Sequence, residues 1–397
     1  MPHQHKRKVY LEDVGLDDAR ARYADALKDA GLGLIPAETV PLTQALGRVT
    51  AEAVVARISA PHYYASAMDG IAVHARDTGG ATETRPKRLR LGEQAMWVDT
   101  GDAMPAGYDA VVMVENVQEL PQGDVEIHAS VAPWQHVRPM GEDVVATELI
   151  LSQGHLIRPV DLGAIAAAGV SEVSVRKRPR VAIIPTGTEL IEPGARVEPG
   201  RIIEFNSLML AGQVAEWGGE PRRGPISHDD YDTIKQAVRA AVAEHDVVLV
   251  NAGSSAGSED FTAEVIGELG QVIVHGVAVR PGHPVILGIV DGKPVIGVPG
   301  YPVSAVLTLE LFLKPLLAQM LGTAPAERPT VQAVMTRKVL SPMGEDEYLR
   351  VSIGRVGQRL VAAPLNRGAG VITSLVRADG IVRIPRFSEG VNVGDLV

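Results

Sequence analysis

The segment from Asp246 to Asp260, DVVLVNAGSSAGSED, is the starting point for predicting the fold of this chain. Its apolar residues Val247–Val250 run into a loop of Gly, Ser and Ala, which two acids follow. This pattern predicts a buried strand that leads through a small-residue loop into a helix. Backbone N–H groups in such a loop can approach a phosphate closely, and the helix N-terminus favours negative charge. An ordinary strand-to-helix turn has the same pattern, so the segment alone leaves both interpretations open.

Predicted strands alternate with predicted helices on both sides of this segment, from residue 179 to residue 323. Such alternation implies right-handed crossovers and a doubly wound, largely parallel sheet. Ligands bind these sheets beyond the carboxyl ends of the strands. Four loops are predicted at those ends: PTGTEL (185–190), NAGSSAGSED (251–260), RPGHP (280–284) and VPGYPVS (298–304). We therefore expect one anion-binding pocket, rimmed with acids, where the four loops meet.

Acidic residues in or near these loops are candidate ligands for a cation or a water molecule. Glu189 lies in the first loop, and Asp229 and Asp230 precede a predicted helix. Asp260 would be a hard-oxygen ligand for Mg²⁺ beside bound phosphates, because Mg²⁺ combines few carboxylates with substrate oxygens. The alternative for Asp260 is an interaction with the helix dipole alone. For Asp229, the role of helix N-cap is favoured over that of a ligand.

Two further positions suit an anion. Arg280 and His283 bracket a rigid Pro-Gly turn that would direct both side chains to the same pocket, although a solvated surface role is the alternative for the arginine. Ser304 stands at the start of a helix predicted over residues 303–321. We expect Ser304 to cap that helix, and free N–H groups at the same helix end would suit an oxyanion.

Composition excludes several kinds of protein. The 397 residues exceed one ordinary domain and predict roughly two to four. The chain has no Cys, which rules out disulfides, thiolate zinc sites and a Cys nucleophile, and fits a reducing compartment. A net charge of −10 argues against a nucleic-acid binder. We find neither a secretion signal nor a run of about 20 apolar residues that would span a membrane, and expect a soluble, cytoplasmic protein.

The rest of the chain predicts smaller structures. Helices at Leu16–Ala30, Leu42–Ala45 and Leu162–Gly169 indicate one elongated domain that packs on something else. Short strands and turns between Arg88 and Ala132 predict a small β domain inserted into it. After a linker rich in Pro and Ala, Gly322–Pro329, further short strands predict a small β-barrel or sandwich.

Three loops of the N-terminal half carry polar residues that suit a ligand. Asp69 lies in SAMDG, where an Asp-Gly pair also predicts a simple turn, and the sequence favours neither role. Thr100 opens the loop TGD, in which a hydroxyl and a free N–H would face a ligand. Asp143 lies beside the glycine turn of VRPMGEDVV (137–145).

No P-loop, GxGxxG, HExxH or GxSxG motif is present, so motif spacing alone does not define the chemistry. Longer motifs, in contrast, resemble those of the molybdopterin molybdenumtransferase family, the MoeA-like proteins and gephyrin E domains. These motifs are SAMDGIAV (66–73), TGDAMPAGYDAVVMVE (100–115), RPMGEDV (138–144), VAIIPTGTEL (181–190), EFNS (204–207), the segment 246–260, VRPGHP (279–284) and VPGYPVSAV (298–306). The similarity covers nearly the whole chain, in the order of the family.

The resemblance implies a fold of four domains. These are an elongated N-terminal and dimerisation domain (1–56 and 138–178), an inserted β domain (57–137), a MogA-like doubly wound α/β domain (179–323) and a small C-terminal β-barrel (327–397). It also implies a homodimer, with the active site between the α/β domain of one subunit and the β domain of the other. The implied reaction needs Mg²⁺: adenylylated molybdopterin is hydrolysed to release AMP while molybdate is inserted at the dithiolene. A molybdopterin adenylyltransferase is an expected partner.

The resemblance and the pocket together give a set of expected site residues. Four are expected to be catalytic, and two of these, Asp229 and Asp260, to hold Mg²⁺; the other catalytic residues are Asp69 and Glu189. Contacts with the pterin, the phosphates and the oxyanion are expected from Thr100, Asp143, Gly253, Ser254, Ser255, Gly257, Arg280, His283, Ser304 and Arg350.

Five positions depart from the family pattern. They are Thr188, where Asp is common, Ala252 in place of Gly, Arg280 and His283 in place of Lys, and Tyr301 in place of Asn. Arg keeps the charge of Lys but not its compact ammonium group. The changes predict a divergent paralogue that uses tungstate, takes a different nucleotide intermediate or has lost catalysis. The alternative function is therefore a non-catalytic molybdopterin-binding or scaffolding protein; an adenylyltransferase is disfavoured because its nucleotide loop matches poorly.

Overall fold

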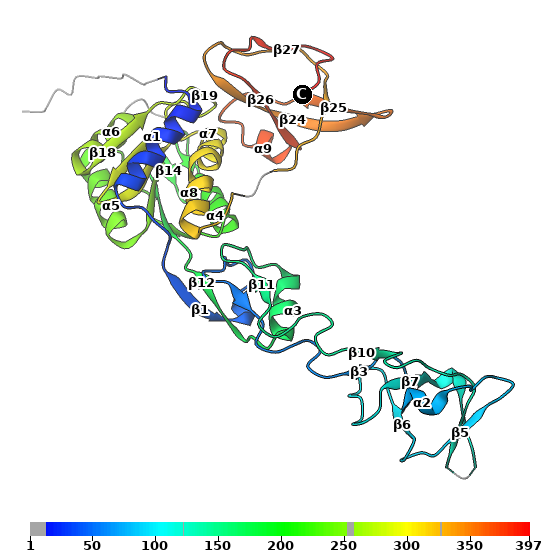
Figure 1. Ribbon diagram of the computed structural model, residues 1–397. Helices are drawn as coiled ribbons and strands as arrows, with labels where there is room; N and C mark the ends of the chain where they lie inside the picture. The colour runs from blue at the N-terminus through cyan, green and yellow to red at the C-terminus, as the bar shows by residue number, and fades with distance from the viewer. Residues whose placement is uncertain (1–12, 122, 252–257, 326–327) are drawn as a thin grey trace, which may run out of the picture. The chain divides into compact units, whose positions relative to one another are not determined.

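The computed structural model describes residues 13–121, 123–251, 258–325 and 328–397, and the side chains of residues 258–260 lie outside this description. Two compact units divide the chain (Figure 1). The larger unit holds Lys177–Val397 together with the N-terminal residues up to Pro36, and the smaller unit is Ala37–Arg176.

A six-stranded sheet forms the centre of the larger unit. Its strands, in spatial order, are β16 (Glu220–Arg223), β13 (Arg180–Pro185), β17 (Val247–Asn251), β21 (Lys293–Val298), β20 (Ile286–Val290) and β18 (Gln271–His275). The first four are parallel to one another, whereas β20 is antiparallel to both of its neighbours. The predicted largely parallel, doubly wound sheet is thus confirmed, with one antiparallel strand inserted by the short β20–β21 hairpin.

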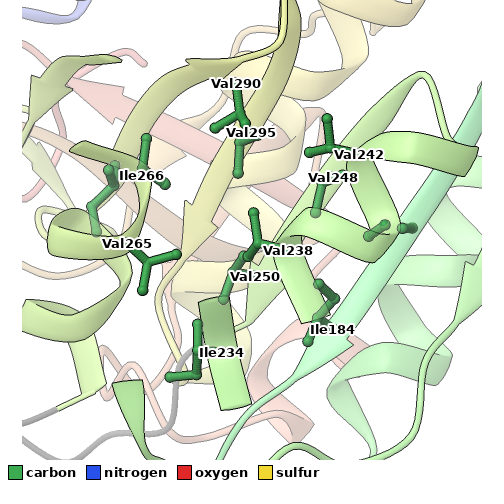
Figure 2. Close-up of a cluster of buried hydrophobic side chains, with 13 residues drawn as sticks. Ile184, Ile234, Val238, Val242, Val248, Val250, Val265, Ile266, Val290 and Val295 are labelled. Atoms are coloured by element: carbon green, nitrogen blue, oxygen red, sulfur yellow. The ribbon is translucent and has the colours of Figure 1, made fainter. Parts of the chain in front are cut away.

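Helices cover this sheet because its central strands are apolar on both faces. They are α4 (Asn206–Glu216), α5 (Tyr231–Glu244), α6 (Ser258–Leu269), α7 (Pro302–Thr308) and α8 (Lys314–Leu321). Figure 2 shows one of the resulting cores, in which side chains of the sheet meet those of α5 and α6: Ile184, Val248, Val250, Val295, Ile234, Val238, Val242, Val265 and Ile266. Each fully buried side chain of this kind contributes about 1.5–3 kcal/mol to folding.

The helix predicted over residues 303–321 is present, but its hydrogen-bonding pattern changes in the middle. Between α7 and α8, residues Leu309–Leu313 form a π-helical turn. Pro315 explains the irregularity, because a proline inside an α-helix lacks the N–H and clashes with the carbonyl four residues earlier. Among the described residues, Pro302–Leu321 is the one helix long and apolar enough to cross a membrane, and 72% of its apolar window is buried within the protein, as in a core helix.

Helix α1 (Leu16–Asp29) belongs to the larger unit, and the domain bounds expected from the sequence stay a prediction. It packs on β18 and β20. Tyr23 is buried and its hydroxyl donates to Gly288 O over 3.3 Å, while Arg20 Nε donates to Leu311 O over 3.1 Å. The physical reason is a narrow stripe of buried residues at helical spacing, Leu16, Ala19, Tyr23 and Leu27, which the many charged neighbours hide in the sequence.

The C-terminal part of the larger unit is a small β structure, as predicted. Its elements are β22 (Val334–Met335), β23 (Val339–Leu340), β24 (Asp346–Val356), β25 (Arg359–Pro364), α9 (Thr373–Val376), β26 (Gly380–Ile384) and β27 (Gly390–Val391). The long strand β24 pairs with β26 along its first half and with β25 along its second. A short strand from the preceding domain, β19 (Val279–Arg280), joins the same sheet in parallel to the start of β24.

The smaller unit has a mixed part and a β part, each with its own core. In the mixed part, β1 (Ala37–Pro41) pairs with β12 (Glu172–Arg176), β2 (Val54–Val55) pairs with β11 (Leu149–Leu151), and η1 (Leu42–Gln44) and α3 (Pro159–Ala167) complete the structure. The β part contains β3 (Ala65–Ser66), β4 (Gly70–Val73), α2 (Ala75–Thr78), β5 (Lys87–Leu89), β6 (Ala95–Val98), β7 (Ala110–Met113), η2 (Val114–Asn116), β8 (Val117–Glu119), β9 (Val125–Ile127) and β10 (Val137–Arg138). The predicted strands near Val112 and Val125 are confirmed, and these two side chains are buried in one cluster with Ile71.

The start of α3 is fixed by a buried carboxylate. Asp161 is 5% exposed, and its oxygens accept from Arg158 N over 2.7 Å, from Arg158 Nη2 over 2.9 Å and from His155 Nε2 over 2.7 Å. The hydrogen bonds from the Arg158 guanidinium are the main reason that the pKa of Asp161 lies well below its usual range. A carboxylate so stabilised contributes to folding only while it is ionised.

We predict that Asp161→Asn lowers the free energy of unfolding of the smaller unit by about 2 kcal/mol at pH 7, because charge-assisted hydrogen bonds are lost. Since the folded pKa is depressed, the stabilisation is present above the unfolded pKa of about 3.9 and is lost as the pH falls further. Urea unfolding at pH 7 and pH 3 measures both effects. The exposed carboxylate of Glu52 supplies the control, Glu52→Gln, and a variant as stable as this control at pH 7 would contradict the assignment.

Candidate functional site

The predicted loops of the α/β domain lie at one edge of its sheet. Strands β13, β17 and β21 are parallel, so their carboxyl ends share that edge. Strand β18 runs in the same direction, because it is antiparallel to β20, which is itself antiparallel to β21. The segment that follows β18 therefore reaches the same edge as the other three loops. Topology brings together the four loops that the sequence predicts to bind an anion.

A buried amide at the end of β17 connects these loops. The main-chain O of Asn251 accepts from Thr186 N over 2.9 Å. Its side-chain Nδ2 donates to Val298 O and Pro299 O over 3.3 and 3.2 Å, and its Oδ1 accepts from Asn206 Nδ2 over 3.1 Å. Asn251 is 4% exposed. The sequence analysis did not single out this residue, although a polar amide that ends a run of apolar strand residues is the signal that would have found it.

The loop after β13 folds back on itself at Gly187. This glycine has a φ of 153°, and its N–H donates to Ser227 O over 3.1 Å. A Cβ at position 187 would lie 3.0 Å from both carboxylate oxygens of Glu189. The half-buried Glu189 carboxylate is thus held over a residue that has no side chain, beside the end of β16. This placement at the sheet edge is the one the sequence predicts for Glu189.

Asp229 does not cap α5, so that part of the sequence interpretation is wrong. The N-cap is Asp230, whose Oδ1 accepts from Thr233 N over 2.9 Å. Hydrogen bonds from Thr233 lower the pKa of Asp230. Asp229 is half-buried at the same sheet edge, directly after the segment that bonds to Gly187. The capping role falls to its neighbour, which leaves Asp229 as the better candidate for a cation ligand.

The remaining residues of the second loop, Gly253, Ser254, Ser255 and Gly257, lie outside the described residues. Asp260 lies in the first turn of α6, as predicted, and its side chain is also outside the description. Within the part of the chain that the structure describes, no group of three or more His, Asp or Glu side chains forms a metal site.

Arg280 and His283 both lie near a carboxylate that the sequence analysis did not consider. His283 Nδ1 is 3.3 Å from Glu345 Oε1, and Arg280 Nη1 is 4.0 Å from Glu345 Oε2. The other ring nitrogen of His283, Nε2, is 3.6 Å from Asp13 Oδ1. Strand β19 carries Arg280 and is hydrogen-bonded to β24, immediately after Glu345. The two predicted anion-binding side chains converge, but an acid lies between them.

Ser304 does not cap α7, which corrects the prediction. The N-cap position is Tyr301, without a side-chain hydrogen bond, and Ser304 is the third helical residue. It is 4% exposed. Of the N–H groups expected to be free at this helix end, that of Val303 donates to Ala369 O over 3.1 Å. A Cβ at Gly282 would lie 3.6 Å from Ser304 O, so the RPGHP turn lies against the same helix end.

Arg350 lies on β24 and is 3% exposed. Its Nη2 donates to Asn366 O over 2.7 Å, whereas its buried Nε has no partner within the described residues. Burial lowers the pKa of Arg350. The side chain lines a cavity of about 20 Å³, room for about one water molecule, together with Pro281, Val303, Tyr348 and Leu375. Arg350 is thus placed between the RPGHP turn, α7 and the C-terminal sheet.

In the smaller unit the structure brings Asp69 and Thr100 together. Asp69 Oδ1 accepts from Thr100 N over 2.6 Å, and the hydrogen bonds from the backbone and hydroxyl of Thr100 lower the pKa of Asp69. Gly101 N donates to Ser66 O over 2.9 Å, and Ser66 N donates to Asp102 O over 2.8 Å. The SAMDG and TGD segments therefore form one loop pair.

Gly70 fixes the backbone next to Asp69, whereas Asp143 lies outside this loop pair. Gly70 has a φ of 156°, and a Cβ there would lie 2.0 Å from Val112 O, so no other residue fits after Asp69 without a main-chain shift. Asp143 is exposed in a separate turn, where its N–H donates to Ala60 O over 3.0 Å. The turn role and the ligand role of Asp69 are therefore compatible, because the carboxylate remains at the surface.

Comparison with known proteins gives the same family along the whole chain. The matching family models are "MoeA N-terminal region (domain I and II)" at residues 14–169, "Probable molybdopterin binding domain" at 182–319 and "MoeA C-terminal region (domain IV)" at 332–397. A protein of Methanocaldococcus jannaschii assigned to molybdopterin biosynthesis is 36% identical over 374 residues, with 90% of each chain covered. Molybdopterin molybdenumtransferase 2 of Mycobacterium tuberculosis is 34% identical over 379 residues, which are 87% of this chain and 90% of that protein.

A solved structure extends the similarity to the fold. The crystal structure of a MoeA molybdopterin biosynthesis protein from Pyrococcus horikoshii is 32% identical, covers 97% of this chain and 98% of its own, and has a TM-score of 0.81. A doubly wound domain of the molybdopterin-binding type, joined to a C-terminal β structure at its strand ends, defines the class of protein. Within that class, the chain belongs to the MoeA family.

We predict that Asn251→Ala lowers the free energy of unfolding of the larger unit by about 2–3 kcal/mol, because two buried carbonyls and the Asn206 amide lose their partner. Urea unfolding followed by circular dichroism measures the change. Asn392 is exposed, so Asn392→Ala controls for the loss of an amide side chain. Equal midpoints for the two variants would show that the network at the sheet edge is not stabilising.

Proposed function

We propose that this protein is a molybdopterin molybdenumtransferase that inserts molybdate, or tungstate, into adenylylated molybdopterin and releases AMP, with Mg²⁺ as the cation. Family membership along the whole chain supports the place of the protein in molybdenum cofactor biosynthesis. The observation that carries the finer proposal is the buried donor Arg350 Nε, which has no acceptor among the described residues. Buried donors of this kind are costly unless a ligand oxygen accepts from them.

An oxyanion is the ligand that suits this donor. Ser304 lies near the N-terminal end of α7, and Arg350 lies close to Val303 and Pro281. Molybdate and tungstate are tetrahedral anions that offer only acceptor oxygens, so a guanidinium, a hydroxyl and the positive end of a helix are complementary to them. Arg280 and His283 lie at the same edge of the sheet and add positive or hydrogen-bonding groups.

The acids of the same edge fit Mg²⁺. Glu189 and Asp229 are half-buried, and neither caps a helix. Mg²⁺ binds through one or two carboxylates plus substrate phosphates and water, so a complete cage of protein ligands is not required. Asp229 and Asp260 would hold the ion, and Glu189 would orient water beside it. When bound, Mg²⁺ offsets the charge of the pyrophosphate that links the pterin to AMP.

Asp69 is proposed to orient the attacking water. The hydrogen bonds from Thr100 favour its carboxylate form at neutral pH, and an exposed carboxylate of fixed geometry accepts a hydrogen bond from water. The proposal needs Asp69 to meet the sheet edge of a second subunit, so we propose that the protein acts as a homodimer. Thr100 and Asp143 would then contact the substrate from the same side as Asp69. We also propose a cytoplasmic location and a molybdopterin adenylyltransferase as the partner that supplies the substrate.

A second candidate function is molybdopterin binding without catalysis. The observation that favours it is the acid between Arg280 and His283, because Glu345 offsets positive charge that an anionic substrate would need. Tight binding of molybdopterin with no turnover would support this function.

The direct test is to mix the purified protein with adenylylated molybdopterin, Mg²⁺ and molybdate and to measure AMP by chromatography. We expect AMP release that depends on molybdate or tungstate and stops when EDTA removes Mg²⁺. Asp69→Asn is expected to lower the rate about 100-fold, the usual size of a lost acid–base group. Asp232→Asn, at an exposed position on α5, is the control. AMP release no faster than in buffer would refute the transferase.

We further predict that Ser304→Ala raises the molybdate concentration needed for half-maximal AMP release about fivefold, because one hydrogen bond of about 1 kcal/mol is lost. The rate at saturating molybdate should change little. Ser152 is exposed, and Ser152→Ala supplies a control for loss of a hydroxyl. If the molybdate dependence of Ser304→Ala is unchanged, the oxyanion does not bind at the start of α7.

A further inference from the structure

Three consecutive acids, Glu345 and the first two residues of β24, each lie near basic residues. Glu347 is buried and bonds to Arg367 twice, Nε to Oε1 and Nη2 to Oε2, each over 2.7 Å. The buried Asp346 accepts from Arg383 Nη2 over 3.2 Å. Both of these pairs lie within the C-terminal β structure and tie its strands together.

Glu345 differs from its two neighbours because its basic partners belong to the α/β domain and not to the C-terminal β structure. Its oxygens lie 3.3 Å from His283 Nδ1 and 4.0 Å from Arg280 Nη1, and both partners belong to the RPGHP segment at the edge of the α/β sheet. The side chain is 26% exposed, against 53% for that of Arg280, so ions from solvent can still reach the cluster. Asp13, 3.6 Å from His283 Nε2, adds a second negative charge.

The position of Glu345 is fixed by the main chain rather than by the side-chain contacts alone. Strands β19 and β24 are paired with Val279 opposite Asp346 and Arg280 opposite Glu347. In addition, Asp346 N donates to Ala278 O over 2.9 Å. The backbone next to Glu345 is therefore held against the segment that carries the two basic side chains.

We propose that Glu345 is a residue of the binding site that limits how strongly the 279–284 segment binds an anion. This inference rests on the proposed function, since it concerns the segment expected to face the oxyanion and the phosphates. With Glu345 and Asp13 beside Arg280 and His283, the segment has as many acidic as basic side chains. An incoming anion is attracted by the bases and repelled by the fixed carboxylate a few ångströms away. The segment is thereby fitted to a weakly held anion that can enter and leave, rather than to a tightly held one.

Calorimetric titration with sodium molybdate, and separately with inorganic phosphate, tests the proposal on the full-length protein at low ionic strength. We expect Glu345→Gln to bind each oxyanion about fivefold more tightly than the unmodified protein, the effect of one nearby charge in a solvent-rich environment. The gain should shrink as salt is added, because salt screens exposed charges. Glu389→Gln removes the same charge from an exposed position of the C-terminal β structure and should have no effect.

The gain should also depend on the two basic residues. In a protein that carries Arg280→Gln and His283→Gln, adding Glu345→Gln is expected to change oxyanion binding by less than twofold. A gain that persists in this background would overturn the proposal, and so would Glu345→Gln binding no better than Glu389→Gln or more weakly. The proposal would also be overturned if neither the unmodified protein nor Glu345→Gln bound molybdate or phosphate.

The AMP-release assay separates this inference from the proposed function. In an active enzyme, Glu345→Gln should lower the molybdate concentration for half-maximal rate and leave the maximal rate unchanged, which a purely structural role would not do. Activity with no shift in molybdate dependence keeps the transferase and rejects the role of Glu345. Tighter oxyanion binding by Glu345→Gln without any AMP release keeps the role of Glu345 and rejects the transferase.

Discussion

A buried carboxamide is stable only when its donors and acceptors are all engaged, and the edge of the α/β sheet is built around that requirement at Asn251. The amide bonds to the carbonyls that follow β21, to the amide that starts α4 and, through its main chain, to the loop after β13. Three loops that are far apart in sequence are thereby held in one arrangement. Residues such as Glu189 and Ser304 take their positions from these loops, so the geometry of the site depends on a residue that need not touch a substrate.

Acidic and basic side chains lie side by side at this edge of the sheet, so their charges partly cancel. The chain has a net charge of −10. Arg280 and His283 face Glu345, whereas Arg350 is buried with one nitrogen that lacks an acceptor among the described residues. In the proposed function, the buried Arg350 supplies the local attraction for an oxyanion, while Glu345 offsets the exposed Arg280 and His283. Arg350 would then recognise the anion, whereas Arg280 and His283 would adjust how tightly the anion is held.

Much of the fold could be predicted from the sequence, because strands and helices of the α/β domain have clear apolar periodicities and end in Gly- and Pro-rich loops. The contact of helix α1 with β18 and β20 could not be predicted, since its buried stripe of Leu16, Ala19, Tyr23 and Leu27 is narrow and lies among charged residues. The cap of α5 could not be assigned between two adjacent aspartates, because only the backbone geometry of Asp230 places its side chain on Thr233 N. Glu189, Asp229, Arg280 and His283 lie at the predicted edge, whereas Asp69, Thr100 and Asp143 lie in the smaller unit. Glu345, the partner of Arg280 and His283, comes from a distant segment and has no local signature.

Strand β19 constrains the chain in a further way. Val279 is 1% exposed and Arg280 points away from that interior, and both are paired with β24 over only two residues. Because side chains alternate along a strand, inserting or deleting a single residue between β18 and β19 would exchange the two, burying the arginine and exposing the valine. The length of this connection is therefore fixed by a neighbouring sheet, and sequence change in the RPGHP segment is restricted to replacement of side chains at constant loop length.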